Sequence, residues 1–178
     1  MRAILIDKTM EPGDARVSEC ATPAPGVGEI LVRVRAAACN FSDILMLQGR
    51  YQEKPAHPFV LGREMAGEVV GRGPGATRFA EGDRVLAATG LGAFAEHVAF
   101  AESIAHPLPE GMPFEVGAAL PIVYPTAYAA LVDRAATAPG ETVLVHAAAG
   151  GVGLAAVQIA KALGARVVAT AGGPATAM

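Results

Sequence analysis

The clearest pattern in the first two thirds of the chain is the alternation of apolar and polar side chains over residues 29–38. Ile30 and Val32 fall on one face and Arg33 on the other, which is the two-residue period of a strand with one buried face. Shorter extended segments, separated by turns rich in Gly and Pro, are predicted at residues 2–6, 15–19, 66–71, 83–88, 93–100 and 103–106. Many short strands at close spacing favour a β-barrel or sandwich over a parallel sheet.

After Pro113 the strand pattern gives way to an Ala-rich stretch, residues 114–136, with apolar residues at mixed helical spacing. Pro121 and Pro125 interrupt this stretch, and a proline inside a helix removes a backbone donor and clashes with the preceding turn. We therefore predict two helical pieces with a kink or break between them.

The next part of the chain predicts one β-α-β unit. An apolar strand, an apolar helix and a second apolar strand are predicted at residues 141–146, 150–163 and 166–171. Strands without alternation are typical of a parallel sheet that is covered on both faces. The predicted fold class is mixed α/β, a β-rich lobe followed by the first unit of a doubly wound domain. We place the domains at residues 1–123 and 124–178.

Composition raises the question of a membrane span and then argues against one. Of the 178 residues, 52% are hydrophobic and the net charge is −3, which excludes a disordered chain. Two stretches without charged residues, 116–132 and 142–160, are long enough to span a bilayer. The first contains two prolines and the second has three glycines near its centre, so we expect buried globular structure and no membrane association.

The N-terminal residues, the cysteines and the basic residues indicate the cellular compartment and the kinds of partner to expect. Asp7 ends the first apolar run too early for the core of a signal peptide, so we expect a cytoplasmic protein. In that compartment Cys20 and Cys39 are expected to be reduced and unpaired. Lys and Arg are scattered without a basic stripe, so nucleic acid is not an expected partner.

The segment between the predicted strand and helix carries the first candidate chemistry. It matches the dinucleotide fingerprint G-x-G-x-x-G, with Ala148 in the first position, Gly150 in the second and Gly153 in the third. Gly150 would let the backbone approach a pyrophosphate, and Gly153 would let the helix lie close to the strand, while N–H groups at the helix start face the anion. The predicted cofactor contacts here are Ala149, Gly150, Gly151, Val152 and Gly153. An ordinary tight turn is the alternative.

The sequence after this helix favours NADPH over NADH. An acidic residue roughly 20 positions downstream holds the ribose 2′-hydroxyl of NAD in this type of fold, and no Asp or Glu occurs after Glu141. The second strand instead ends in an uncharged tip, where Thr170 and Gly172 are predicted cofactor contacts. Lys161 and Arg166 are the only cations in this region, and the source of a cation for a 2′-phosphate stays open.

Four segments together resemble a known family. They are Ala38-Cys39-Asn40-Phe41-Ser42-Asp43, Leu61-Gly62-Arg63-Glu64-Met65-Ala66-Gly67-Glu68-Val69, Tyr124-Pro125-Thr126-Ala127-Tyr128 and the stretch from His146 to Lys161. In these segments the chain is similar to the zinc-independent, zeta-crystallin-like quinone oxidoreductases of the medium-chain dehydrogenase/reductase superfamily. The resemblance spans essentially the whole chain. It implies a GroES-like catalytic lobe, a Rossmann domain, NADPH, and hydride transfer to a small-molecule quinone or α,β-unsaturated carbonyl.

The resemblance also bears on metal binding. Zinc-binding relatives have Cys at the position of Asn40 and His at that of Arg63, and they carry a run of four cysteines for a structural zinc. Amide and guanidinium groups are not usable zinc ligands, and two cysteines cannot form a four-cysteine site. The histidines show no ligand spacing; they are His57, His97, His106 and His146. We therefore expect no metal site.

The resemblance places two side chains at the nicotinamide end of the cleft. Asn40 is expected to orient cofactor or substrate, and Tyr51 to donate a hydrogen bond to the developing enolate oxygen. An exposed aromatic ring on a mobile loop is the alternative for Tyr51. Thr126 is expected to contact the cofactor through its hydroxyl, a role compatible with that of a helix N-cap. Glu64 is expected to be a structural partner, with Arg63 as its candidate.

The length of the chain predicts that the nucleotide-binding domain is incomplete. A doubly wound domain needs several β-α-β units and only the first is present, so we expect the N-terminal portion of a longer enzyme, or a chain that another chain completes. A homo-oligomer formed through the open edge is one such arrangement. Thr176 stands about where many relatives have a Lys that can pair with the 2′-phosphate. Two alternative functions remain: an enoyl-thioester reductase of the acryloyl type on the same fold, and a catalytically silent GroES-like binding module.

Overall fold

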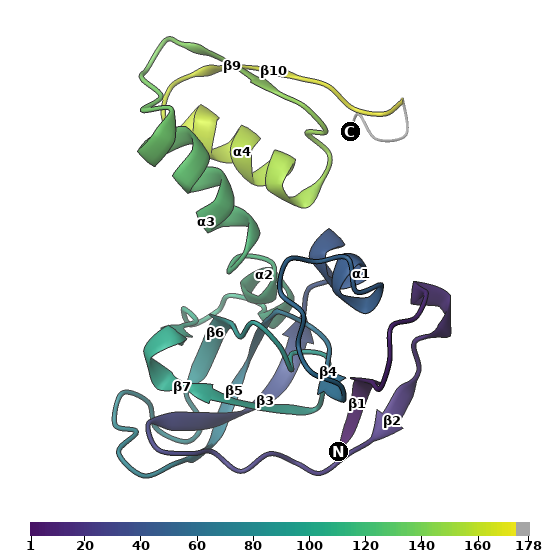
Figure 1. The fold of residues 1–178 in the computed structure, drawn as a ribbon. Helices are drawn as coiled ribbons and strands as arrows, with labels where there is room; N and C mark the ends of the chain where they lie inside the picture. The colour runs from purple at the N-terminus through teal and green to yellow at the C-terminus, as the bar shows by residue number, and fades with distance from the viewer. Residues whose placement is uncertain (174–178) are drawn as a thin grey trace. The chain divides into compact units, whose positions relative to one another are not determined.

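The computed structural model describes residues 1–173, which fold into two compact units (Figure 1). The first unit is Met1–Pro121 and the second begins at Ile122. The first contains the antiparallel sheets, and the second contains a strand, a helix and a strand. The predicted boundary after residue 123 falls at the start of the second unit.

A five-stranded sheet forms the body of the first unit, in the order β7-β3-β5-β6-β8. Its strands are β3 Glu29–Ala37, β5 Glu64–Arg72, β6 Arg84–Ala88, β7 His97–Ala101 and β8 His106–Pro107. Neighbouring strands are antiparallel throughout, and Ile30 of β3 lies opposite Phe100 of β7 and Arg72 of β5. The prediction that this part of the chain forms several strands and no parallel sheet is confirmed.

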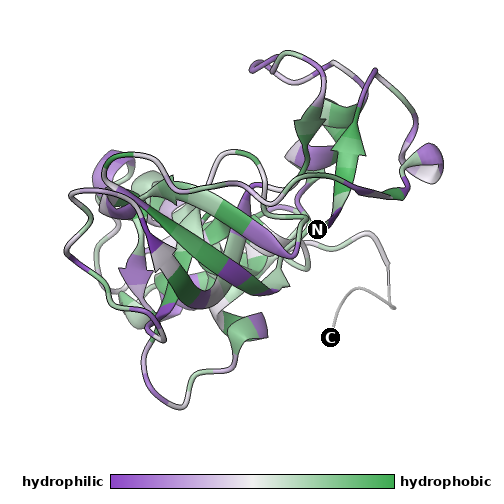
Figure 2. Cartoon of the chain, turned by 90° about the horizontal axis from the view of Figure 1, so that it is seen from below, coloured by the Kyte–Doolittle hydropathy of each residue, from purple (hydrophilic) through white to green (hydrophobic). Residues whose placement is uncertain are grey.

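The alternation predicted for residues 29–38, which include β3, is also confirmed. Ile30 and Val32 are fully buried, whereas Arg33 and Arg35 are exposed. The buried face belongs to the main hydrophobic cluster, which includes Met65, Val69, Val85, Val98 and Phe100. Figure 2 shows apolar segments next to hydrophilic ones along the strands. Because a fully buried aliphatic side chain contributes about 1.5–3 kcal/mol, this cluster supplies a large share of the free energy of folding.

A second, three-stranded sheet in the order β2-β1-β4 lies in the same unit. It consists of β1 Arg2–Ile6, β2 Val17–Glu19 and β4 Phe59–Val60. Helix α1, Phe41–Leu47, packs on it through a cluster that comprises Ile6, Met46, Leu47, Phe59 and Leu61. The sequence pattern predicts β1 and the whole of β2, although it starts β2 two residues early. It predicts neither β4 nor α1, because these two elements are too short for their periodicity to stand out.

Two strand predictions need correction. Residues 102–104 form a 3-10 turn and only His106–Pro107 pair as β8, so the predicted strand at 103–106 is wrong. The strand predicted from residue 93 begins at His97. Before it, the N–H of Ala93 donates to the carbonyl of Gly62 (3.0 Å), and Ala95 bridges to Ala3 of β1. The segment therefore crosses from one sheet to the other, which local alternation cannot reveal.

The helical stretch after Pro113 breaks as predicted. Helix α2, Phe114–Ala118, belongs to the first unit, and helix α3, Val123–Tyr128, opens the second. The α3 helix continues as η3, a π-helical segment at Ala129–Arg134. The break between α2 and α3 includes Pro121, while Pro125 lies inside α3.

The second unit contains the predicted β-α-β arrangement. Strand β9, Thr142–Val145, pairs in parallel with β10, Arg166–Ala169, and α4, Gly151–Ala162, connects them. Figure 1 shows α3 and α4 on one side of this pair of strands. Leu144 and Val168 are about half exposed, so the expectation of a sheet covered on both faces is wrong for the described residues. Among residues 1–173, no helix is long and apolar enough to cross a membrane.

Candidate functional site

The turn between β9 and α4 is the first candidate site, and its backbone is tightly folded. Ala147 adopts a left-handed conformation with a φ of 51°, which is uncommon for a residue with a Cβ. The N–H of Gly150 donates to the carbonyl of Ala147 (2.9 Å), and the N–H of Ala148 donates to the carbonyl of Thr170 (2.9 Å). Because Thr170 follows β10 directly, these bonds hold the turn against the ends of both strands.

The second and third glycines of the fingerprint, Gly150 and Gly153, differ in how much space their surroundings leave for a side chain. A Cβ at Gly153 would overlap the carbonyl oxygen of Ala147 and lie 2.8 Å from Cα of Ala148, so glycine lets the helix start this close to the turn. A Cβ at Gly150 would meet only that same carbonyl oxygen, at 3.3 Å. The fold itself therefore requires glycine at 153, whereas the space beside Gly150 is open to a ligand.

The start of α4 has the properties of an anion site. Gly150 is the N-cap residue in an extended conformation, and the N–H of Leu154 donates back to its carbonyl (2.8 Å). The N–H groups of Gly151, Val152 and Gly153 precede that bond, so they have no acceptor within the helix. Together with the positive end of the helix dipole they suit a phosphate group. A hollow of ≈ 400 Å³ borders the same turn.

The remaining predicted contacts of the strand ends are exposed. Ala149 stands in the turn, and Thr170 and Gly172 follow β10. The Thr170 hydroxyl lies 3.0 Å from Nδ1 of His146, which joins the carboxyl ends of β9 and β10. Thr176, which the resemblance is expected to place near a lysine of many relatives, lies outside the described residues.

Thr126 lies inside α3 and is exposed. Because α3 begins at Val123, the N-cap role is wrong. The Thr126 hydroxyl donates to the carbonyl of Ile122, one turn earlier (2.6 Å). A hydroxyl that donates in this way still has lone pairs that can accept from a ligand.

Asn40, in the first unit, precedes α1 directly and is held from two sides. Its backbone N–H donates to Oδ2 of Asp43 (2.7 Å), which stabilises the start of the helix. Its Nδ2 donates to Oε1 of Glu64 (2.7 Å), and Glu64 is only 1% exposed. Because the amide nitrogen donates to a carboxyl oxygen, this bond fixes which end of the amide faces Glu64, and Oδ1 lies at the other end, where the capping box directs it to the backbone N–H of Asp43. Glu64 thus has a structural partner in Asn40.

Tyr51 follows α1 and is half-buried, so the alternative of an exposed ring is wrong. The ring packs against the cluster that contains Ile6 and Leu47. Its hydroxyl oxygen accepts a hydrogen bond from Nη1 of Arg63 (2.7 Å), and Cζ of Arg63 lies 4.8 Å from the ring centroid. Nη2 of Arg63 lies 3.6 Å from Oε2 of Glu53. Tyr51 is therefore held by a charged donor.

Comparison with known proteins agrees with this arrangement. The family model of the alcohol dehydrogenase GroES-like domain matches residues 26–110. Human quinone oxidoreductase is 39% identical over 174 residues, which cover 97% of this chain and 53% of the human protein. The crystal structure of Escherichia coli quinone oxidoreductase complexed with NADPH matches with a TM-score of 0.92 at 36% identity, and the match covers 99% of this chain and 54% of that one. Over nearly its whole length the chain is therefore similar to the quinone oxidoreductases of the medium-chain dehydrogenase/reductase superfamily.

The chain spans about half the length of the relatives it matches. Its β-rich GroES-like region and its parallel strand-helix-strand unit make up the N-terminal half of the fold of the medium-chain dehydrogenase/reductase superfamily. A segment of polyketide synthase GfsB from Streptomyces halstedii is 50% identical over 146 residues, which cover 81% of this chain and 2% of that protein. The match to quinone oxidoreductases therefore extends further along the chain, and the match to the synthase is higher in identity.

Asn40 and Arg63, which the resemblance aligns with the ligands of zinc-binding relatives, are both engaged in other contacts. The amide nitrogen of Asn40 is bonded to Glu64, and the guanidinium of Arg63 contacts Tyr51 and Glu53. Neither group is a zinc ligand in proteins. Within residues 1–173, no group of three or more His, Cys, Asp or Glu side chains is placed to hold a metal ion. The donor set at this place suits hydrogen bonding rather than metal coordination.

Asp43 adds a buried carboxyl group beside Asn40. It is 4% exposed, and burial raises the pKa of its carboxyl above the ordinary value, although the N–H of Asn40 and the charge of Arg63 act in the opposite direction. Asp43, Asn40 and Leu47 line one side of a mostly apolar hollow of ≈ 700 Å³ in the first unit, and Phe94 lines another. Such a hollow favours an apolar ligand with few polar groups.

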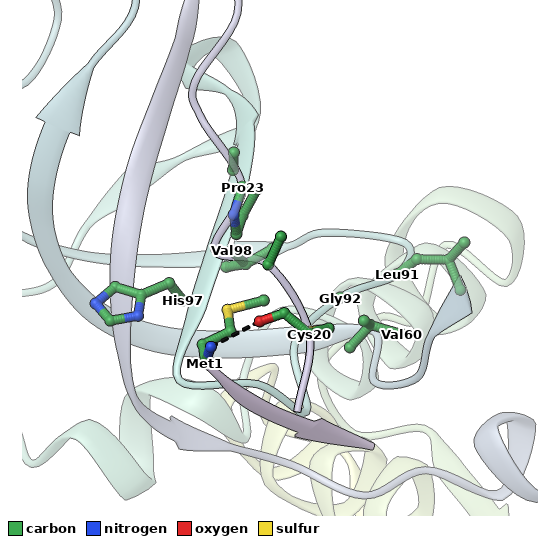
Figure 3. Close-up of a pocket in the computed structure, with 10 residues that line it drawn as sticks. Met1, Cys20, Pro23, Val60, Leu91, Gly92, His97 and Val98 are labelled. Atoms are coloured by element: carbon green, nitrogen blue, oxygen red, sulfur yellow. Dashed lines mark hydrogen bonds between the residues drawn. The ribbon is translucent and has the colours of Figure 1, made fainter. Parts of the chain in front are cut away.

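A further hollow in the first unit, of ≈ 420 Å³, carries less chemistry (Figure 3). Cys20 contributes its carbonyl, which accepts from the amine of Met1 (2.7 Å). Figure 3 shows the ring of His97 turned away from Cys20, so the thiol and the imidazole do not form a pair. Val60 and Leu91 make the rest of the wall apolar. We assign no function to this hollow.

Proposed function

We propose that this chain forms the N-terminal half of an enzyme that reduces quinones or α,β-unsaturated carbonyls with NADPH, by hydride transfer without zinc. The turn from β9 into α4 carries the proposal, because Gly153 lets the helix approach the turn while the space at Gly150 stays open beside the first N–H groups of α4. The family relationship supports it, since quinone oxidoreductases match over nearly the whole chain.

The second unit fits a dinucleotide through its backbone. The N–H groups of Gly151, Val152 and Gly153 would hold the pyrophosphate, while Thr170 and Gly172 would border the ribose. NADPH supplies the hydride, so the protein has to bind, orient and exclude water rather than provide an acid or base at the nicotinamide ring. The related Escherichia coli structure is described as a complex with NADPH, which favours the same cofactor here.

The first unit fits the reacting end of the substrate. Reduction of an enone or quinone places negative charge on a carbonyl oxygen, which a fixed hydrogen-bond donor stabilises. Tyr51 is the candidate donor, because Arg63 already donates to its oxygen and the phenolic hydrogen remains for another acceptor. Asn40 presents Oδ1, which can accept from an amide or hydroxyl group of cofactor or substrate.

The proposal is tested by adding NADPH to the purified full chain and following the fluorescence of the cofactor, and then its oxidation at 340 nm after a simple quinone is added. We expect saturable binding and turnover. Binding without turnover on quinones or enones would favour a catalytically silent module. Absence of binding would show that the chain does not act as a reductase by itself.

We also expect NADPH to bind more tightly than NADH. Residues 142–178 contain no acidic side chain, so this stretch offers no carboxylate to hold a 2′-hydroxyl or to repel a 2′-phosphate. Parallel fluorescence titrations give the ratio of the two dissociation constants, which we expect to exceed about tenfold, the effect of roughly 1.4 kcal/mol. Equal or tighter binding of NADH would contradict this assignment.

A second candidate is reduction of an enoyl thioester of the acryloyl type. It is kept because segments of polyketide synthases match this chain at higher identity than the quinone oxidoreductases do. Steady-state kinetics with a quinone and with an acryloyl thioester separate the two, and the substrate with the higher kcat/KM identifies the activity.

A further inference from the structure

Arg63 and Tyr51 form a contact that the fingerprint residues do not include. The loop that carries Tyr51 follows α1, while Arg63 stands directly before β5, so only the tertiary fold brings them together. Nη1 of Arg63 donates to the Tyr51 oxygen at 2.7 Å, and the guanidinium also lies over the ring. A charged donor to a neutral acceptor makes a stronger hydrogen bond than a neutral donor does.

This contact determines what the hydroxyl of Tyr51 can do. A guanidinium has donors only, so the phenolic oxygen has to act as the acceptor and its own hydrogen points elsewhere. The donated bond also withdraws electron density from the oxygen, which makes the remaining hydrogen a better donor. The Tyr51 hydroxyl is thereby committed to donating to a group other than Arg63.

Arg63 is itself held in place. Its side chain is 16% exposed, and Glu53 draws the other end of the guanidinium toward the protein surface. Its backbone carbonyl accepts from the N–H groups of Thr89 (2.8 Å) and Gly90 (3.3 Å), which lie at the end of β6. The sheet therefore fixes the position of the Arg63 guanidinium, whereas the Tyr51 ring that it contacts belongs to a loop.

We propose that Arg63 is a positioning residue, which directs the hydroxyl of Tyr51 toward the carbonyl oxygen of the quinone or enone. This inference rests on the proposed function. Arg63 touches neither substrate nor cofactor in this role and acts through Tyr51. Its contribution is to hold the donor in the geometry that the developing negative charge requires.

The test compares Tyr51→Phe, Arg63→Met, Arg63→Lys and the Tyr51→Phe/Arg63→Met double variant in the full chain. We expect Tyr51→Phe to lower kcat with a quinone about 100-fold, as loss of one oxyanion donor does. Arg63→Met should lower kcat about tenfold, because the donor remains but is misplaced. KM for NADPH should not change. Arg63→Lys, which keeps one charged donor, should recover part of the loss.

The double variant separates action through Tyr51 from independent action. If Arg63 acts through Tyr51, adding Arg63→Met to Tyr51→Phe lowers kcat by less than about twofold. Multiplication of the two single effects would overturn the proposal, because Arg63 would then act on the substrate or on the fold by itself. Arg50→Met is the matched control, because this substitution removes the same charge from an exposed side chain next to Tyr51 in the sequence. We expect kcat to stay unchanged in this variant.

A spectroscopic measurement keeps the proposal independent of turnover. Protein labelled with ¹³C at Cζ of tyrosine gives signals for Tyr51, Tyr124 and Tyr128, and Tyr51→Phe identifies the first by its loss. We expect Arg63→Met to shift the Tyr51 signal and leave the other two in place. An unmoved signal would overturn the proposal. If the wild-type chain reduces no quinone or enone, the proposed function fails and the positioning role falls with it, even if the signal shows the hydrogen bond.

Discussion

Gly153→Ala is expected to weaken NADPH binding roughly 100-fold and to destabilise the second unit by about 1–3 kcal/mol. The added methyl group would overlap the carbonyl oxygen of Ala147, which belongs to the turn itself. That backbone cannot move away, because its neighbour Ala148 is bonded to Thr170 at the end of β10. The helix start would have to shift, and the N–H groups that face the phosphate would shift with it. Fluorescence titration and thermal unfolding measure the two effects.

Gly150→Ala is the matched control, because its methyl group would meet only the Ala147 oxygen, at 3.3 Å. We expect its stability to stay within about 0.5 kcal/mol of wild type, while NADPH binding weakens because the methyl group occupies the space meant for the pyrophosphate. Full NADPH affinity in Gly150→Ala would argue that the pyrophosphate does not approach this turn. Full affinity in Gly153→Ala would show that the helix start is not part of the site.

Gly67→Ala is expected to lower the stability of the first unit by about 3 kcal/mol, the upper end of the usual cost of overpacking. Gly67 lies in the middle of β5, paired with Val34 on one side and Val85 on the other. A Cβ there would overlap the carbonyl oxygen of Arg33 and lie 2.8 Å from a methyl group of Val32. Both neighbours belong to β3, which is paired with β5 on one side and β7 on the other, so neither can yield without opening the sheet. Urea unfolding followed by circular dichroism gives the free energy.

Gly71→Ala, on the same strand, provides the comparison. Its Cβ would only make ordinary contacts with Leu31, the nearest at 3.6 Å. We expect a change of less than about 1 kcal/mol, and alanine reduces the entropy of the unfolded chain, which favours the folded state. If the two variants were equally stable, the close approach at Gly67 would be absent in solution.

Much of the architecture could be predicted because it depends on local patterns. The alternation of Ile30, Val32 and Arg33 identifies β3, since a strand with one buried face has a period of two. The β-α-β unit is equally readable, because two apolar strands flank an apolar helix. The segment at 103–106 could not be read in this way, since too few of its residues pair for their pattern to distinguish a strand from a turn.

The candidate site also has one part that local sequence patterns predict and one part that they do not. The glycine turn could be placed from spacing alone, because each glycine has a local reason. The bond between Asn40 and Glu64 and the contact between Tyr51 and Arg63 could not, since each joins residues from different elements. The adjacent acidic and basic residues before β5 are a signal in the sequence, but only the fold shows which side chain each one meets.

Arg63 and Glu64 are consecutive residues, so one peptide unit sets the distance between the supports of Tyr51 and Asn40. That peptide leads into β5, a strand paired on both sides. Any slip of β5 by one residue would exchange the two faces and displace both supports together. The spacing between the two polar groups that face the substrate is therefore set by β5 and its pairing in the sheet. The loops that carry Tyr51 and Asn40 do not set it.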